Sequence, residues 1–264
     1  MGNPAAGGGR WVEVAPERFV TWVKSFERRH GGARVAGCPA GLILTAADGA
    51  EAECHVPFPP MPAGPEGGPA EGAGQGPADG SRTGAAEADG LVASCAAAAA
   101  AHAAAPRTVG VLLVRLGGYA AGVFAGSPPE LIASKTGSRQ VHGRSAAGGW
   151  SQHRFARRRD KQAAEALHAA ADAALRVFGG FPAGLDAVVL GGDRRTAAGL
   201  RDDPRLRPYL AQATDRFLTV PDPRLPVLRD SPRGFRAIRV RLTEPPPAPA
   251  PPQTPTTKGL LRCT

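Results

Sequence analysis

Glycine, serine and basic residues dominate the stretch from Lys135 to Arg159, which reads KTGSRQVHGRSAAGGWSQHRFARRR. No Asp or Glu occurs in it, and few apolar residues could anchor its first half to a core. A long segment without regular structure in a compact domain is usually functional or disordered. We therefore expect a mobile loop over residues 135–152 that reaches into a polyanion.

A long helix is expected from about Gln152 to Phe178, where apolar and alanine residues recur at helical spacing before Gly179-Gly180. Its first turns are rich in arginine, although cations are unfavourable at a helix N-terminus. That N-terminus offers N–H groups to anions, and arginine adds forked donors. The pattern favours phosphate contact over a solvated charged face. The expected RNA-contacting residues are Lys135, Arg139, His142, Arg144, Arg154, Arg157, Arg158, Arg159 and Lys161.

The composition agrees with an acidic partner, because the 264 residues carry a formal net charge of +9. No apolar run approaches the roughly 18 residues of a membrane span, and the N-terminal residues have no apolar signal region. We therefore expect a cytoplasmic protein that does not bind membranes. The four cysteines form no CxxC pair and His55 beside Cys54 has no second ligand pair, so we expect no metal and no cofactor.

The chain divides by composition into four parts. Residues 1–56 predict a small α/β module: a strand from Arg10, a helix from Pro16 to Gly31, and a hairpin that turns at Asp48-Gly49. Residues 57–106 predict a low-complexity, mostly disordered linker, although the Ala-rich run 91–105 could be helical. Residues 107–242 predict the main domain, and residues 243–264 a Pro-rich disordered tail.

Buried strands frame the main domain. The runs 109–114, 119–124 and 130–134 predict three strands before the loop, and 185–190 and 216–220 predict two more after the long helix. A last strand is expected over 235–242, where arginines alternate with apolar residues. This order predicts an α/β sandwich with a mixed sheet.

The segment HGRSAAGGWSQHRFAR (142–157) resembles the catalytic-loop region of eukaryotic and archaeal class-I peptide-chain release factors, in which HGRGGQ precedes a helix with RFAR. VGVLLV…YAAGVF and DAVVLGGDRRTAAGL resemble neighbouring elements of the same domain, so the resemblance spans about residues 108–220. Here the glutamine stands two positions later, as Gly149-Trp150-Ser151-Gln152. That form is similar to the Vms-type branch, the release-factor-like peptidyl-tRNA hydrolases. The resemblance implies a ribonuclease-H-like fold.

The resemblance also implies a mechanism. Gln152 would position the water that attacks the ester between peptide and tRNA, and Gly148 and Gly149 would let the backbone approach the tRNA end. A neutral amide suffices, because an activated ester needs mainly a water held in line. Gln140 stands in a second G-x-x-Q and is a competing candidate. His142 and His153 are alternatives as proton shuttles.

The implied substrate is peptidyl-tRNA in the peptidyl transferase centre of a stalled ribosome or a separated large subunit. We expect codon-independent release, because residues 1–56 are too short for a codon-reading domain and nothing beyond Leu242 supplies another. The protein is expected to be a monomer away from the ribosome. Its arginines would grip rRNA or tRNA phosphates, so binding should weaken steeply with salt.

Three other functions stay open on the sequence. The loop could promote endonucleolytic cleavage of the tRNA 3′ end, or the protein could be a non-catalytic ribosome- or RNA-binding module. A ribonuclease-H-like nuclease would need clustered carboxylates for a metal ion. Asp186 and Asp193 flank one strand, but the sequence offers no convincing third carboxylate.

Overall fold

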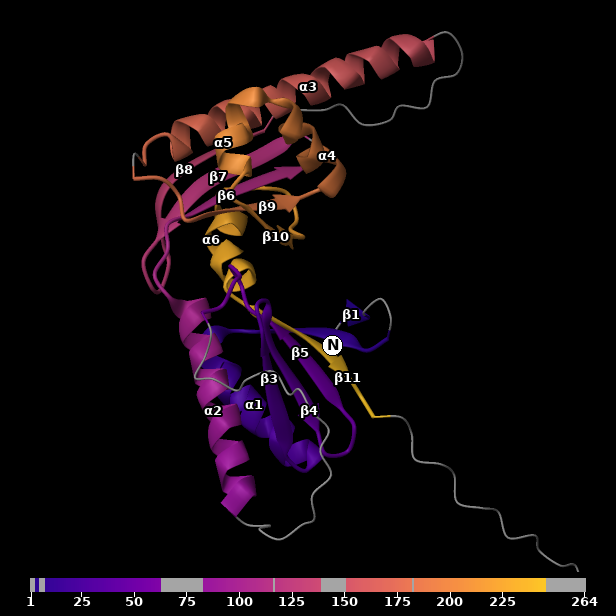
Figure 1. Ribbon diagram of the computed structural model, residues 1–264. Coiled ribbons are helices and arrows are strands. Elements are labelled where there is room, and N and C mark those ends of the chain that lie inside the picture. The colour runs from indigo at the N-terminus through magenta and orange to yellow at the C-terminus, as the bar shows by residue number, and fades with distance from the viewer. Residues whose placement is uncertain are drawn as a thin grey trace, which may run out of the picture.

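The computed structural model describes residues 3–4, 8–62, 83–115, 117–138, 151–181 and 183–245. For residues 3–4, 83–89 and 151–163 it describes the backbone alone. The described residues form two β-sheets with helices packed on each, and Figure 1 shows the second sheet with α3 above and the first sheet with α1 and α2 below. The fold class is therefore α/β, as the sequence predicts.

The first sheet is antiparallel and has the strand order β1-β2-β11-β5-β4-β3 in the described part of the chain. Its strands are β1 (Asn3–Pro4), β2 (Arg10–Val14), β3 (Ala33–Cys38), β4 (Gly41–Ala46), β5 (Glu51–His55) and β11 (Ile238–Thr243). Strands β4 and β5 pair across residues 47–50, which confirms the hairpin expected there.

Helix α1 (Pro16–His30) covers one face of this sheet with its apolar side. Phe19, Val23 and Phe26 lie one helical turn apart and are all buried. Gly31 ends the helix at φ 76°, a conformation that glycine adopts without strain. The helix predicted from Pro16 to Gly31 is confirmed.

Helix α2 (Thr83–Ala104) lies where the sequence predicts mostly linker. Val92, Ala96, Ala99 and Ala103 recur on one side of it and are buried in the same core as α1. The small alanine side chains let α2 lie close to its neighbours, so an Ala-rich run that looks like low complexity is a packed helix. The helical alternative for residues 91–105 is the one that agrees with the structure.

The second sheet is mixed, with the described strands in the order β10-β9-β6-β7-β8. Its strands are β6 (Val109–Arg115), β7 (Gly118–Ala125), β8 (Glu130–Ser138), β9 (Ala187–Gly192) and β10 (Ala213–Leu218). Strands β6, β7 and β8 form an antiparallel meander, whereas β9 and β10 run parallel to β6. This confirms the α/β sandwich with a mixed sheet, in the strand order of a ribonuclease-H-like fold.

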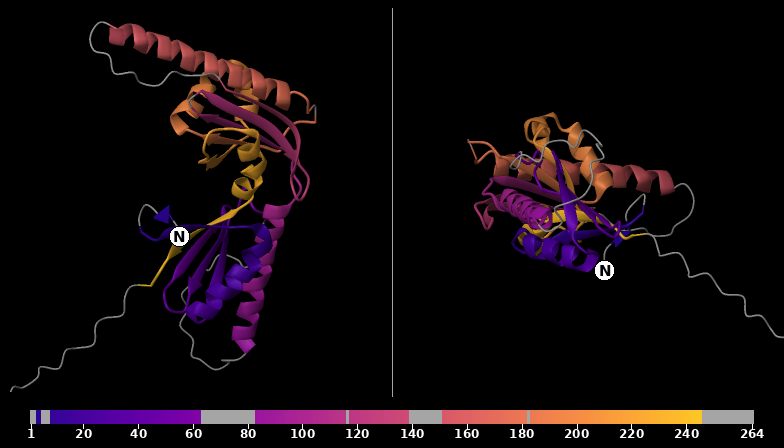
Figure 2. Two further views of the ribbon diagram at one scale, coloured as in Figure 1. Left: turned by 180° about the vertical axis from the view of Figure 1, so that it is seen from behind. Right: turned by 60° about the horizontal axis from the view of Figure 1, so that its bottom comes forward.

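Helix α3 (Ser151–Phe178) packs on one face of the second sheet, and α6 (Leu225–Phe235) packs on the other. Among the described side chains of α3, the buried ones run from Ala170 to Phe178. Figures 1 and 2 show the N-terminal half of α3 projecting past the sheet. The predicted helix is confirmed, and its C-terminal half is anchored to the sheet by apolar packing.

The boundaries of the predicted loop differ from the structure at both ends. Strand β8 continues to Ser138, so Lys135 lies in a strand and not in a loop. Helix α3 begins at Ser151, so Gln152 belongs to its first turn. Strand pairing explains the first difference, because residues 134–138 pair with β7 although their own side chains are mostly polar or absent.

Strand β11 belongs to the first sheet, whereas the sequence analysis assigned residues 235–242 to the main domain. It lies between β2 and β5 and pairs antiparallel with both. Ile238, Val240 and Leu242 join the core beneath α1 and α2. The alternation identified a half-exposed strand correctly, but a period-2 pattern does not say which sheet a strand joins.

Short helical segments connect β9 to β10: α4 (Arg194–Ala198), 3₁₀ turns at Gly199–Asp202 and Pro204–Leu206, and α5 (Arg207–Leu210). Helix α6 was not predicted, because Pro226 and Pro232 obscure its pattern. In the described ranges, no helix is long and apolar enough to cross a membrane.

Candidate functional site

The residues expected to act on the substrate lie mostly outside the described part of the chain. This holds for Gly148, Gly149, Arg139, Gln140, His142 and Arg144. The structure places the backbone of Gln152, His153, Arg154, Arg157, Arg158, Arg159 and Lys161 in the projecting half of α3, but their side chains are outside the described part. The site is therefore built from the elements at the two ends of residues 139–150.

Residues 139–150 begin at one edge of the second sheet, directly after β8. Ser138 at the end of β8 is paired with Gly118, and Gly118 with Arg115 at the end of β6. Val114 of β6 is in turn paired with Gly192 at the end of β9. The carboxyl ends of β6, β8 and β9 thus meet at one edge, which is where open α/β sheets usually bind their ligands.

Two glycines at this edge are required by close packing. The ring of Tyr119 lies over Gly137 and occupies the place where a Cβ atom would stand. Gly192 has φ 101°, and a side chain there would collide with the Val114 carbonyl. The strand ends of β8 and β9 at this edge are thus packed closely against β7 and β6.

Lys135 is the one RNA-contacting candidate whose side chain is described. It is exposed on β8 and pairs with Ala121. Directly paired residues of antiparallel strands point to the same face, and Ala121 packs into the core beneath α3. Lys135 therefore lies on the face that α3 covers, a few residues before the predicted loop.

The two aspartates that flank β9 serve as structural acceptors. Asp193 caps α4: its Oδ1 accepts from the Thr196 backbone N–H at 2.8 Å and from the Thr196 hydroxyl at 2.7 Å. The backbone bond, and then the hydroxyl bond, hold the pKa of Asp193 below its usual value. At the opposite end of the strand, Asp186 accepts from the Thr108 backbone N–H at 2.6 Å.

Asp186 and Asp193 cannot share a metal ion, because six residues of β9 separate them and a strand rises about 3.3 Å per residue. Within the described ranges, no group of three His, Cys, Asp or Glu residues is placed to hold a metal. The nuclease hypothesis therefore has no support from the described carboxylates.

Arginines directly follow the buried strands at this edge. Arg115 ends β6, and Arg194 and Arg195 come after β9; all three are exposed. We call these three residues the basic rim. The sequence analysis missed them, although VGVLLVR and VVLGGDRR each place arginine at the carboxyl end of a strand predicted to be buried, which is a recognisable ligand-site signal.

The contacts of Arg115 and Arg194 fix the rim to the end of β10. The Arg115 Nη1 donates to the Val220 carbonyl at 3.1 Å, and its Nε lies 3.9 Å from the Asp222 carboxylate. The Arg194 guanidinium lies 4.5 Å from the centroid of the Phe217 ring. Arg115 and Arg194 are thus oriented cations beside the start of residues 139–150, suited to bind phosphate groups.

A sequence profile of the acVLRF1 family, described as the Actinobacteria/chloroflexi VLRF1 release factor, matches residues 107–241, which is just over half of the chain. The chain belongs to this family. The acVLRF1 match begins at Arg107, just before β6, and ends within β11. It confirms the Vms-type release-factor-like assignment that rests on residues 108–220.

Two archaeal structures are similar to this acVLRF1 protein at low identity. One is titled as the crystal structure of the archaeal translation termination factor aRF1, with a TM-score of 0.36, 14% identity, 46% of this chain covered and 32% of that chain covered. The other is an archaeal protein with a TM-score of 0.33 and 14% identity, covering 49% of this chain and 36% of that chain. The acVLRF1 chain thus spans about a third of the length of each. No curated protein matches it.

Proposed function

We propose that the protein acts at the ribosome as a codon-independent peptidyl-tRNA hydrolase. It would cleave the ester between peptide and tRNA on stalled ribosomes or large subunits and release the nascent chain into the cytoplasm. The observation that carries the proposal is the acVLRF1 release-factor match over residues 107–241. The basic rim beside the root of residues 139–150 supports it, because a substrate with tRNA is a polyanion.

In the proposed mechanism, Gln152 holds the attacking water. An ester of a tRNA ribose is already activated, so holding a water in line with its carbonyl supplies much of the rate. The glutamine amide both donates and accepts a hydrogen bond, which orients a water without a general base. Gly148 and Gly149 would let the backbone approach the tRNA end, because they have no side chains.

Position in the fold gives Gln152 a mechanical basis for this role. It stands in the first turn of α3, whose C-terminal half is fixed to the sheet by Ala170, Ala174 and Phe178. A stiff helix anchored at one end can carry its other end into a deep site. The α3 arginines and the arginines of the basic rim would bind rRNA or tRNA phosphates along the way.

The decisive experiment is single-turnover release of labelled peptide from stalled ribosomal complexes, with wild type beside Gln152→Ala. We expect release by the wild type and a loss of about 100-fold in the variant, the scale of a misplaced reactant. Gln140→Ala is the matched control and should release peptide at the wild-type rate. Complexes with a stop codon, a sense codon or no codon in the decoding site should be equal substrates.

Sizing the tRNA in the same samples separates the remaining alternatives. An intact CCA end is expected after ester hydrolysis, whereas a shortened tRNA would mean endonucleolytic cleavage of the 3′ end. Tight, salt-sensitive ribosome binding without release by the wild type would contradict hydrolysis and leave a binding module. Loss of release in Gln140→Ala but not in Gln152→Ala would move the water-positioning role to Gln140.

A further inference from the structure

A groove of about 510 Å³ lies between the two sheets. We call it the intersheet groove. The end of β10, α6 and the start of α4 line it from the second sheet, and Glu13 of β2 and Arg239 of β11 line it from the first. Its charged residues are Arg194, Arg216, Arg239, Glu13 and Asp230. A volume of this size is in the range of small-ligand sites.

Arg216 is half-buried in the groove. Its Nη1 donates to the carbonyls of Gly234 and Ala237, at 2.6 and 2.5 Å. Burial, and then the nearby Arg239 charge, lower the pKa of Arg216 to about 10, so it stays charged at neutral pH. In the described part of the chain, no carboxylate forms an ion pair with Arg216, although the nearby Glu13 charge partly offsets the lowering of its pKa.

Aromatic rings orient the other two arginines. The Arg239 guanidinium lies 4.6 Å from the centroid of the Trp11 ring, and Arg194 lies 4.5 Å from that of Phe217. Stacking uses the flat face of a guanidinium and leaves its N–H edge to donate hydrogen bonds. Both arginines are therefore held as oriented donors and not as freely moving surface charges.

The charge of the groove is positive on balance. Three arginines line it against two carboxylates among the described residues. Asp230 is also 3.5 Å from Arg233, which does not line this groove, and Glu13 is 3.9 Å from the Arg239 Nε. With three arginines against these two carboxylates, the described lining keeps a net positive charge.

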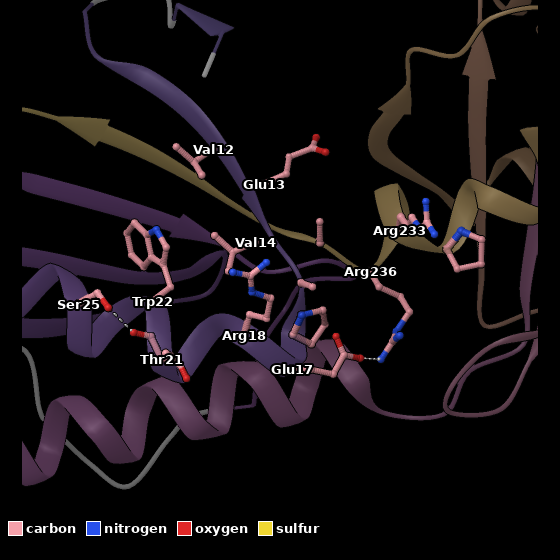
Figure 3. Close-up of a pocket in the computed structure, with 14 residues that line it drawn as sticks. Val12, Glu13, Val14, Glu17, Arg18, Thr21, Trp22, Ser25, Arg233 and Arg236 are labelled. Atoms are coloured by element: carbon pink, nitrogen blue, oxygen red, sulfur yellow. Dashed lines mark hydrogen bonds and ion pairs between the residues drawn. The ribbon is translucent and has the colours of Figure 1, made fainter. Parts of the chain in front are cut away.

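A larger groove of about 730 Å³, between α1, β2 and α6, makes a useful comparison (Figure 3). Val12, Val14 and Trp22 line it, and its Arg236 forms an ion pair with Glu17 at 2.8 Å (Figure 3). Arg18 and Arg233 also line that groove, and Arg233 lies 3.5 Å from Asp230. The intersheet groove differs from it in holding a half-buried arginine, Arg216, that forms no ion pair with a described carboxylate.

We propose that the intersheet groove binds the phosphate backbone of an RNA strand. Arg194 belongs both to this groove and to the basic rim, so an RNA strand held at the root of residues 139–150 can continue into the groove. The choice of RNA as the polyanion rests on the proposed function, whereas the anion site itself rests on the three arginines. A planar, oriented guanidinium can donate two parallel hydrogen bonds to the oxygens of one phosphate group.

Fluorescence anisotropy of a labelled single-stranded RNA 12-mer with the full chain tests this site. Arg194→Gln and Arg239→Gln should each weaken binding about tenfold, as expected for a lost charge-assisted hydrogen bond. The slope of log affinity against log salt should become shallower by about 0.7 for each phosphate contact removed. The matched control is Arg34→Gln, because Arg34 is exposed on β3 at the far edge of the first sheet. This variant should change neither the RNA affinity nor the salt slope.

The outcomes separate this inference from the proposed hydrolysis. Gln152→Ala should keep wild-type affinity for the 12-mer, whatever it does to peptide release. Wild-type RNA affinity and salt slope in both Arg194→Gln and Arg239→Gln would overturn the groove as an RNA site. Displacement of the RNA by inorganic pyrophosphate at equal phosphate concentration would assign the groove to small phosphates instead. Arg216 is a poor primary variant, because its bonds to Gly234 and Ala237 also hold the end of α6.

Discussion

Single residues at the carboxyl edge of the second sheet divide into those that hold the fold and those that remain available to a ligand. Asp193 belongs to the first group, since its carboxylate is occupied by Thr196. Arg194, the next residue, belongs to the second group, because only its flat face is used by Phe217. Adjacent positions thus have separate roles, and a substitution at each should affect a different measurement.

Asp193→Ala should lower the melting temperature of the protein at pH 7. The folded-state pKa of Asp193 lies below its unfolded value, so its stabilisation is present above the unfolded pKa and is lost as pH falls through the folded pKa. The deficit of the variant should therefore shrink below about pH 4. Asp193→Asn keeps an acceptor oxygen, so its melting temperature at pH 7 should fall by less than that of Asp193→Ala. Thermal unfolding of wild type and Asp193→Ala at pH 7 and pH 3 measures this difference. An equal difference in melting temperature at both pH values would contradict the prediction.

At the scale of elements, strand β11 matters most for the stability of the first sheet. It lies in the middle of that sheet although it comes from the end of the described chain. Its residues 238–242 pair with β2 on one side and with β5 on the other. Arg239 and Arg241 point to the open face, while Ile238 and Val240 are fully buried. The strand therefore supports the first sheet's core and carries one wall of the intersheet groove.

Ile238→Ala should lower the free energy of unfolding by about 2–5 kcal/mol, the usual cost of removing a buried isoleucine side chain. Ile238 has no solvent exposure and packs in the core under α1 and α2. Thr243→Ala at the exposed end of the same strand is the control and should change stability by less than about 0.5 kcal/mol. Urea unfolding measures both, and similar midpoints for the two variants would show that β11 is not part of the core.

At the scale of the molecule, three aromatic residues join the two sheets. Phe235 at the end of α6 is buried, and its ring centroid lies 5.6 Å from that of Phe124 on β7 and 6.2 Å from that of Phe58 after β5. Arg107 stacks on Phe58 at 4.9 Å and donates to the His102 carbonyl at the end of α2. Because this junction packs the two sheets together, we expect them to unfold together.

Phe235→Ala should cost about 3–5 kcal/mol and separate the unfolding of the two sheets. Two of the three tryptophans, Trp11 and Trp22, lie in the first sheet and its helix α1, so tryptophan fluorescence reports on that part, whereas circular dichroism reports on both sheets. The two probes should give one transition in the wild type and two in the variant. Phe235→Leu keeps most of the apolar contact and should retain a single transition. Coincident transitions in Phe235→Ala would mean that the junction does not couple the sheets.

The sequence by itself determined the local elements and the family. The spacing of Phe19, Val23 and Phe26 predicted α1, and the buried runs predicted β6, β7 and β9, because helices and strands have different side-chain periods. The order of motifs around residues 142–157 led to the release-factor-like assignment, which the acVLRF1 match confirms. The roles of Gln152 and its neighbouring glycines stay predictions.

Only the tertiary structure decided what lies beside what. The pattern of β11 predicted a strand, but pairing with β2 and β5 depends on partners more than 180 residues away in the sequence. The alanines of α2 carry little periodic signal, and contact with α1 and β3 decides that they are buried. The meeting of Arg194, Arg216 and Arg239 in one groove follows from the same long-range packing. Local periodicity fixes the type of an element, whereas its neighbours are chosen by complementary surfaces that no short stretch of sequence contains.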